Sequence, residues 1–269
     1  MNSPICLFDS GIGGLTVLKK LINKFPNEEY IYLADLINVP YGDKSKNEIK
    51  EIASGIIEYL SRFDPKLIIM ACNTSSSVLC EQGRINPAPT IPLYGMIQSL
   101  AKEIASSHYS KVSIWATKLV TENNAYKNAI HKINPKITVE EISCPKLVPM
   151  IESLNFNEAD KIKIIQEYLN MISKDSQALI LGCTHYPLLE DEIKKLRKIE
   201  IIDPADALVR DLDNYMRSKG MPWQTPTGGK SNIISLYTTA QIEKVEGFFR
   251  IYTGEDIKAN LIALKKVAI

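Results

Sequence analysis

The chain has 269 residues, of which 45% are hydrophobic and 23% charged, with 13 glycines and 14 prolines, and this composition excludes a disordered, fibrous or disulfide-stapled miniature protein. Its length predicts one large domain or two ordinary ones. Because 32 Lys and Arg face 31 Asp and Glu, the net charge is +1, which excludes an overall cationic field for nucleic acid or an acidic bilayer and favours a small-molecule substrate.

Short apolar runs rich in Ile, Val, Leu and Tyr alternate along the chain with longer amphipathic stretches. This alternation is typical of parallel strands joined by crossover helices and predicts the α/β class. Strands are expected at residues 5–8, 30–34, 67–71, 93–96, 111–116, 138–142, 178–182 and 200–202. Helices are expected at residues 15–24, 46–63, 75–82, 97–107, 123–132, 147–154, 158–174, 188–198, 205–218 and 239–253.

The apolar runs, the N-terminal residues and the cysteines indicate the cellular location of the protein and the redox state of its thiols. No apolar run approaches the roughly 20 residues that span a bilayer, so no membrane partner is expected. Residues 1–11 lack the basic region, apolar core and cleavage site of a secretory signal, which predicts a cytoplasmic protein. The five cysteines form no C-x-x-C pair, so free thiols are expected rather than disulfides or a zinc cluster.

Residues 8–14, FDSGIGG, predict a strand, a sharp turn and a helix start, whose backbone N–H groups suit an anion. A dinucleotide fingerprint would need glycine where Thr16 stands. A turn in which Asp9 accepts hydrogen bonds from backbone amides explains the segment equally well. GGKS at 228–231 fails as a phosphate-binding loop, because Gln224 replaces the required glycine, and a surface loop is expected there.

Residues 67–74 and 179–185 resemble each other: each is a buried strand that ends in a small residue, followed by a cysteine and polar residues. The carboxyl ends of strands in an open α/β sheet face the ligand crevice, so Cys72 and Cys183 are both expected there. We predict two similar three-layer α/β half-domains with mainly parallel sheets, related by a pseudo-twofold axis, with the active site in the cleft between them.

The proline-rich segments 87–95 and 201–207 are the natural crossovers between these halves. If the chain returns at the second crossover, its C-terminal part rejoins the first half. The expected domains are therefore residues 1–95 plus 207–269, and residues 96–206.

A cysteine at the end of a buried strand is usually inert. The matching contexts of Cys72 and Cys183 indicate instead a symmetric pair, and a position at a helix start is expected to lower the pKa of each thiol. Cys6, Cys80 and Cys144 lack this context, so structural roles are expected for them.

His185 follows Cys183 by two residues, a spacing compatible with Cys–His nucleophilic catalysis. The three histidines have no carboxylate spacing typical of a metal site. Taken alone, Asp9 and Glu152 are expected to have capping or surface roles.

Five segments in chain order resemble the glutamate racemases of the aspartate/glutamate racemase superfamily. They are FDSGIGGLTV at 8–17, VPYGDKS at 39–45, ACNTSSS at 71–77, CPKLVPMIE at 144–152 and LGCTHYPLL at 181–189. The resemblance implies a cofactor-independent, metal-free enzyme that interconverts L- and D-glutamate, supplies D-glutamate for peptidoglycan, and acts as a homodimer.

The resemblance also implies the roles of individual residues. Cys72 and Cys183 would be the two catalytic bases, with Asp9, His185 and Glu152 assisting them. The amine and carboxylates of the substrate would be held by residues of the same motifs: Asp9, Ser10, Pro40, Tyr41, Gly42, Asn73, Thr74, Thr117, Thr184 and His185. Two thiols on opposite faces of the α-carbon suit racemisation, which needs a base on one face and an acid on the other.

The chain departs from the family pattern at Ala34, Leu36, Asn38, Gln98 and Val120. These departures leave the catalytic motifs intact and concern substrate preference, the interface or regulation. An aspartate racemase would share the paired thiols. A hydrolase that uses only Cys183 and His185 would leave Cys72 unexplained. A non-catalytic amino-acid-binding protein would need neither of the two thiols.

Overall fold

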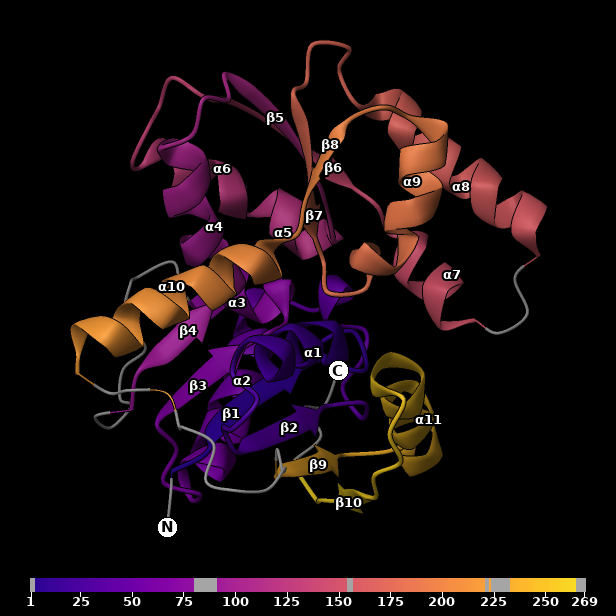
Figure 1. Ribbon diagram of the computed structural model, residues 1–269. Coiled ribbons are helices and arrows are strands. Elements are labelled where there is room, and N and C mark those ends of the chain that lie inside the picture. The colour runs from indigo at the N-terminus through magenta and orange to yellow at the C-terminus, as the bar shows by residue number, and fades with distance from the viewer. Residues whose placement is uncertain (1–2, 80–90, 154–156, 221–222, 224–232, 265–269) are drawn as a thin grey trace.

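The computed structural model describes residues 3–79, 91–153, 157–220, 223 and 233–264. Two parallel sheets with flanking helices make up the fold (Figure 1). The first sheet has the order β10-β9-β2-β1-β3-β4, formed by β1 (Ile5–Asp9), β2 (Tyr30–Ala34), β3 (Leu67–Met70), β4 (Leu93–Gly95), β9 (Ile234–Thr238) and β10 (Ala259–Leu261). The second has the order β6-β5-β7-β8, formed by β5 (Lys111–Ala116), β6 (Thr138–Ser143), β7 (Ala178–Gly182) and β8 (Glu200–Ile202).

Helices cover both faces of each sheet. They are α1 (Leu15–Lys24), α2 (Lys46–Ser61), α3 (Asn73–Leu79), α4 (Met96–Ala105), α5 (Lys118–Glu122), α6 (Ala125–His131), α7 (Leu147–Glu152), α8 (Glu158–Met171), α9 (Glu190–Leu196), α10 (Pro204–Ser218) and α11 (Ile242–Thr253). Two short 3-10 helices, η1 (Tyr41–Asp43) and η3 (Tyr186–Leu189), precede α2 and α9. Within the described ranges, no helix is long and apolar enough to cross a membrane.

Alternating side chains of the central strands build the cores. In β1, Ile5 and Leu7 join the cluster beneath α1, α10 and α11, whereas Cys6 and Phe8 join the cluster beneath α2 and α3. Strand β5 does the same in the second sheet, where α4 and α6 cover one face and α7, α8 and α9 cover the other. Burial on both faces explains why these strands are continuous apolar runs, and the predicted α/β class is confirmed.

The same strand order occurs twice. In the first sheet β2-β1-β3-β4 follow one another, and the second sheet is β6-β5-β7-β8, so β3 and β7 hold equivalent places. This repeat supports the prediction of two similar halves. The domain limits at 95/96 and 206/207 stay a prediction, which the return of β9 and β10 to the first sheet supports.

Several predicted boundaries were wrong. The predicted helix at 239–253 begins only at residue 242, after Gln241 in the left-handed region (φ 50°), and β9 precedes it. The predicted helix at 123–132 begins only at residue 125, after Asn124 in the left-handed region (φ 47°), and the short helix α5 that precedes it was not predicted. Strands β9 and β10 escaped prediction because both are only partly buried and β10 has just three residues, so their apolar pattern is weak.

The remaining boundary differences are smaller. Helix α3 begins at residue 73 rather than 75, and the first turn of the helix predicted at 188–198 is η3. Residues 80–90, with Cys80 and part of the first crossover, residue 154, and the loop at 228–231 lie outside the described residues.

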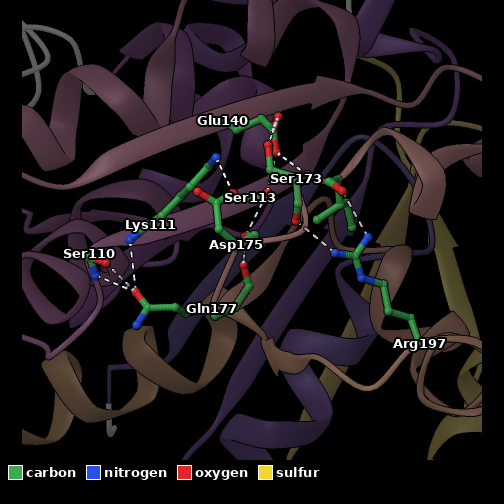
Figure 2. Close-up of polar contacts among 11 residues, drawn as sticks. Ser110, Lys111, Ser113, Glu140, Ser173, Asp175, Gln177 and Arg197 are labelled. Carbon is green, nitrogen blue, oxygen red and sulfur yellow. Dashed lines mark hydrogen bonds and ion pairs between the residues drawn. The ribbon is translucent and has the colours of Figure 1, made fainter.

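A polar network holds the turn between α8 and β7 (Figure 2). The Arg197 guanidinium donates to three backbone carbonyls at the end of α8, among them that of Ser173. Glu140 accepts hydrogen bonds from the hydroxyls of Ser113 and Ser173 at 2.6 and 2.8 Å. A guanidinium suits the unpaired carbonyls of a helix C-terminus. The network therefore fixes the point at which β7 enters the sheet.

We expect Arg197→Met to lower the free energy of unfolding by about 1 to 3 kcal/mol, because three carbonyls lose a charged donor. Urea denaturation measures this loss. Lys118→Met is the control: it removes an exposed pair with Glu122 at 3.8 Å and should cost less than about 0.5 kcal/mol. Equal losses in the two variants would show that the network contributes no more than a surface pair.

Candidate active site

The carboxyl ends of the central strands from the two sheets meet. In Figure 1 the second sheet lies above the first, with β7 directed towards α1. The hydroxyl of Thr184, two residues after β7, donates to Asp9 Oδ1 at the end of β1 at 3.3 Å. Thr16 in α1 donates to the carbonyl of Thr184 at 3.1 Å. Thr184 therefore joins the halves at the place where the sequence predicted the site.

The glycine-rich turn is shaped by this contact. A Cβ atom at Gly13 would lie 2.4 Å from Oγ1 of Thr184 and 2.5 Å from Nδ1 of His185, so only glycine allows the approach. Within the turn, Asp9 Oδ2 accepts the Gly11 amide at 3.0 Å, as the capping interpretation predicted. The glycine at position 13 is therefore explained by packing between the halves.

Asp9 is fully buried. Burial raises the pKa of its carboxyl above the ordinary value, although the charge of His185 and hydrogen bonds from the turn oppose the rise. The carboxyl faces both halves, since it receives the Thr184 hydroxyl and its charge also acts on the Cys72 thiol.

Cys72 lies between β3 and α3 and is 5% exposed. Its thiol is 3.8 Å from the Ser10 hydroxyl. Burial raises the pKa of this thiol to about 12, and the charges of Asp9 and Cys183 add to the rise. The expectation that a helix start would lower this pKa was therefore wrong, because burial outweighs the Ser75 backbone hydrogen bond and the contact with the Ser10 hydroxyl. The Cys72 side chain is a neutral thiol at pH 7.

Cys183, 7% exposed, begins a chain of polar contacts. Its sulfur lies 3.8 Å from Nδ1 of His185, and Nε2 of His185 lies 2.8 Å from Oε1 of Glu152 in α7. The other carboxylate oxygen, Oε2, is 2.7 Å from Nζ of Lys244 in α11. The structure thus unites Cys183, His185 and Glu152, as the resemblance implied.

This contact chain is an ion-pair network at neutral pH. Burial opposes protonation of His185, but hydrogen bonds with Cys183 and Glu152 outweigh it and raise the pKa of the imidazole to about 10. Burial likewise opposes ionisation of Glu152, yet hydrogen bonds from His185 and Lys244 lower its pKa to about 2. An imidazolium therefore stands beside the sulfur of Cys183, held by an ionised carboxylate.

Two further pairs cross between the halves. The Tyr126 hydroxyl in α6 donates to Oδ1 of Asn73, while Nδ2 of Asn73 is buried without a hydrogen-bond partner. Oγ1 of Thr74 lies 3.0 Å from Oγ1 of Thr117. A buried amide donor without a partner is costly in a folded protein, and an acceptor on a bound ligand would satisfy it.

The segment around Tyr41 is placed differently from the other motifs. The Tyr41 hydroxyl donates to Asp35 at 2.7 Å, so its side chain belongs to a structural network. Gly42 lies against Thr117, with 3.1 Å from a Cβ atom at Gly42 to that of Thr117. Pro40 is exposed.

Sequence reasoning missed three residues of this site. Thr16 and Tyr126 lie in segments that were recognised, but nothing in their local pattern predicts a contact with the opposite half. Lys244 lies 92 residues from Glu152, in a segment without a motif. Among the described residues, no three His, Cys, Asp or Glu side chains are grouped to hold a metal ion, and Cys6 and Cys144 are buried in the cores.

Comparison with known proteins supports the resemblance. Residues 13–212 match the Asp/Glu/Hydantoin racemase family model. The chain is 35% identical over 246 residues to glutamate racemase 3 of Caldanaerobacter subterraneus, covering 89% of this chain and 88% of the relative. It is 36% identical over 267 residues to the glutamate racemase of Prochlorococcus marinus, covering 97% of both.

Solved structures agree. The glutamate racemase of Francisella tularensis in complex with D-glutamate matches with a TM-score of 0.87 and 32% identity, over 97% of this chain and 98% of that one. Glutamate racemase RacE1 of Bacillus anthracis matches with a TM-score of 0.88 and 29% identity, over 98% and 99%. An aspartate racemase of Picrophilus torridus, 18% identical with a TM-score of 0.62 over 83% and 96%, shares the fold.

The span matched by the family model includes Cys72, Cys183, His185 and Glu152, and it covers most of the chain. Relatives at 35% and 36% identity extend the match to 95% and 97% of the chain. This chain therefore belongs to the Asp/Glu/Hydantoin racemase family.

Proposed function

We propose that this protein is a cofactor-independent glutamate racemase that interconverts L- and D-glutamate, with Cys72 and Cys183 as its two acid–base groups. The observation that carries the proposal is the placement of these cysteines after β3 and β7, which are equivalent strands of a repeated topology. The contact between Asp9 and Thr184 brings the two strand ends together. The relatives named glutamate racemase, one of them bound to D-glutamate, support the choice of substrate.

The chemistry requires one proton to leave and one to arrive. The sulfur of one cysteine, as thiolate, takes the α-hydrogen on one face of the substrate, and its S–H bond forms as the Cα–H bond breaks. The thiol of the other cysteine then gives its proton to the opposite face. Cys72, a neutral thiol at pH 7, suits the donor role in one direction, and the roles exchange in the other.

The remaining site residues serve binding and charge stabilisation in this proposal. The unpartnered Nδ2 of Asn73 suits a substrate carboxylate. Thr74, Thr117 and Thr184 provide further hydroxyls, Ser10 lies beside the Cys72 thiol, and the charge of Asp9 acts on that thiol. Tyr41 and Gly42 contribute backbone, and exposed Pro40 shapes the rim. Both cysteines are almost fully buried, which keeps water from the carbanion formed at the α-carbon.

The proposal extends to the cellular role. We expect the product D-glutamate to serve peptidoglycan synthesis, in the cytoplasm, by a homodimer that needs no cofactor, metal, nucleic acid or membrane. The family resemblance supports the role and the dimer, and the near-zero net charge supports a small-molecule substrate.

Incubation with L-glutamate in D₂O tests the function directly. Proton NMR should show loss of the α-proton signal, and circular dichroism should show decay to zero. An aspartate racemase would exchange aspartate instead. A Cys–His hydrolase or an amino-acid-binding protein would exchange neither amino acid and would end the proposal.

Replacement of either cysteine should abolish most of the turnover. Cys72→Ala and Cys183→Ala are each expected to lower kcat by about 10²- to 10⁴-fold, the usual contribution of a positioned acid or base. Cys144→Ala, in the core of the second half, is the control and should retain the turnover of the folded protein. Near-normal racemisation by either site variant would contradict the two-thiol mechanism.

Racemisation should also proceed without an added cofactor or metal ion. Protein purified without pyridoxal phosphate and dialysed against EDTA is expected to keep its full rate, since the site chemistry uses side chains of the chain itself. Polarimetric assays with and without added pyridoxal phosphate or divalent metal check this. A strict requirement for either addition would refute the cofactor-free reaction.

The two faces of the site should respond differently to mutation. His185→Asn changes the partner of Cys183, whereas Asp9→Asn changes a charge that acts on Cys72. Each variant should therefore lose kcat unequally in the two directions, with opposite bias. Because the equilibrium constant between enantiomers is one, kcat/KM stays equal for both, and KM must shift with kcat. Circular dichroism in both directions measures this, and equal losses for both variants would disprove the division of roles.

A further inference from the structure

The C-terminal helix α11 reaches the charge network of the active site. Nζ of Lys244 lies 2.7 Å from Oε2 of Glu152, while His185 holds the other oxygen, Oε1, at 2.8 Å. The lysine and glutamate side chains are 26% and 19% exposed, so this ion pair is half-buried. One carboxylate thus has two cationic partners, one on each oxygen.

The position of Lys244 is set by the packing of α11. Its neighbours Val245 and Phe249 are buried in the cluster beneath α1, and they are spaced four residues apart on one face of the helix. This anchor holds α11 on the first half of the molecule, whereas Glu152 belongs to α7 of the second half. The carboxylate is therefore held from both halves.

The contact between Lys244 and Glu152 affects the orientation of His185. A carboxylate held on one oxygen alone can rotate about its last side-chain bond, because terminal sp³–sp² torsions are broad. An ammonium group on Oε2 restricts that rotation and keeps Oε1 directed at Nε2 of His185. The positive charge of Lys244 also offsets part of the attraction between the Glu152 carboxylate and the His185 imidazolium.

We propose that Lys244 is a positioning residue for the proton transfer at Cys183: it fixes the Glu152 carboxylate so that His185 keeps its orientation towards the sulfur. This inference rests on the proposed racemase function and adds to it a residue from the opposite half of the molecule. Lys244 acts through Glu152 and does not touch the reacting atoms.

The test compares kcat in both directions for Lys244→Met, Lys244→Arg and a control. Lys244→Met should lower kcat by about 5- to 20-fold, between the effects of exposed and buried ion pairs, and unequally for L- and D-glutamate. Lys244→Arg should recover most of the rate, because it restores a cation. Lys258→Met removes another lysine that pairs with a glutamate of α11, Glu246, at 3.4 Å but is 94% exposed, and it should leave kcat unchanged.

A double-mutant cycle separates positioning from a general structural role. In a Glu152→Gln background, Lys244→Met should cause almost no further loss, because its route to His185 is already removed. Additive losses would overturn the inference, as would a Lys244→Met variant as active as Lys258→Met. If Lys244→Met is unfolded by circular dichroism, Lys244→Gln takes its place with the same expected results. Absence of racemisation by the unmodified protein would refute the proposed function itself.

Discussion

The close approach of the segment after β7 to the glycine-rich turn after β1 is the constraint on which the site depends. Thr184 and His185 lie where a side chain at Gly13 would stand, and the Thr184 hydroxyl reaches Asp9. The contact places Cys183 and His185 relative to the first half, and the Tyr126–Asn73, Thr74–Thr117 and Lys244–Glu152 pairs add to it. A methyl group at position 13 would collide with the Thr184 hydroxyl and the His185 ring, so these side chains or the segment that carries them would have to shift.

Burial then determines how the site handles charge. For the Cys72 thiol and the Asp9 carboxyl, burial outweighs the opposing hydrogen bonds and charges, and the pKa of each rises. Around Cys183 the arrangement is different, because His185 and Glu152 form an ion pair that withstands burial. The two thiols occupy equivalent places in a repeated topology but have different electrostatic surroundings. Such a difference is compatible with proton transfer in both directions, since each direction uses the two thiols in exchanged roles.

Polar contacts outside the site also help to position the strand ends that form it. The Arg197 network secures the entry of β7 into its sheet, and Asp35 accepts the hydroxyls of Tyr41 and Thr239, tying η1 to the segment after β9. Helix α10 packs against both α4 and α1, so it connects the covering helices of the two halves. These contacts position the strand ends, and the two cysteines of the site follow those ends.

What the sequence determined by itself was local. Continuous apolar runs predicted the central strands, because burial on both faces leaves no polar alternation, and the small residue before Cys72 and Cys183 marked both strand ends. The resemblance to a family assigned roles to Asp9, Glu152 and His185. Only the tertiary structure decided which partners these groups meet: Lys244 and Tyr126 come from segments whose local patterns encode helices and nothing about the site. It also decided that the pKa of Cys72 rises, since desolvation depends on the surrounding atoms of both halves and not on the residues adjacent in sequence.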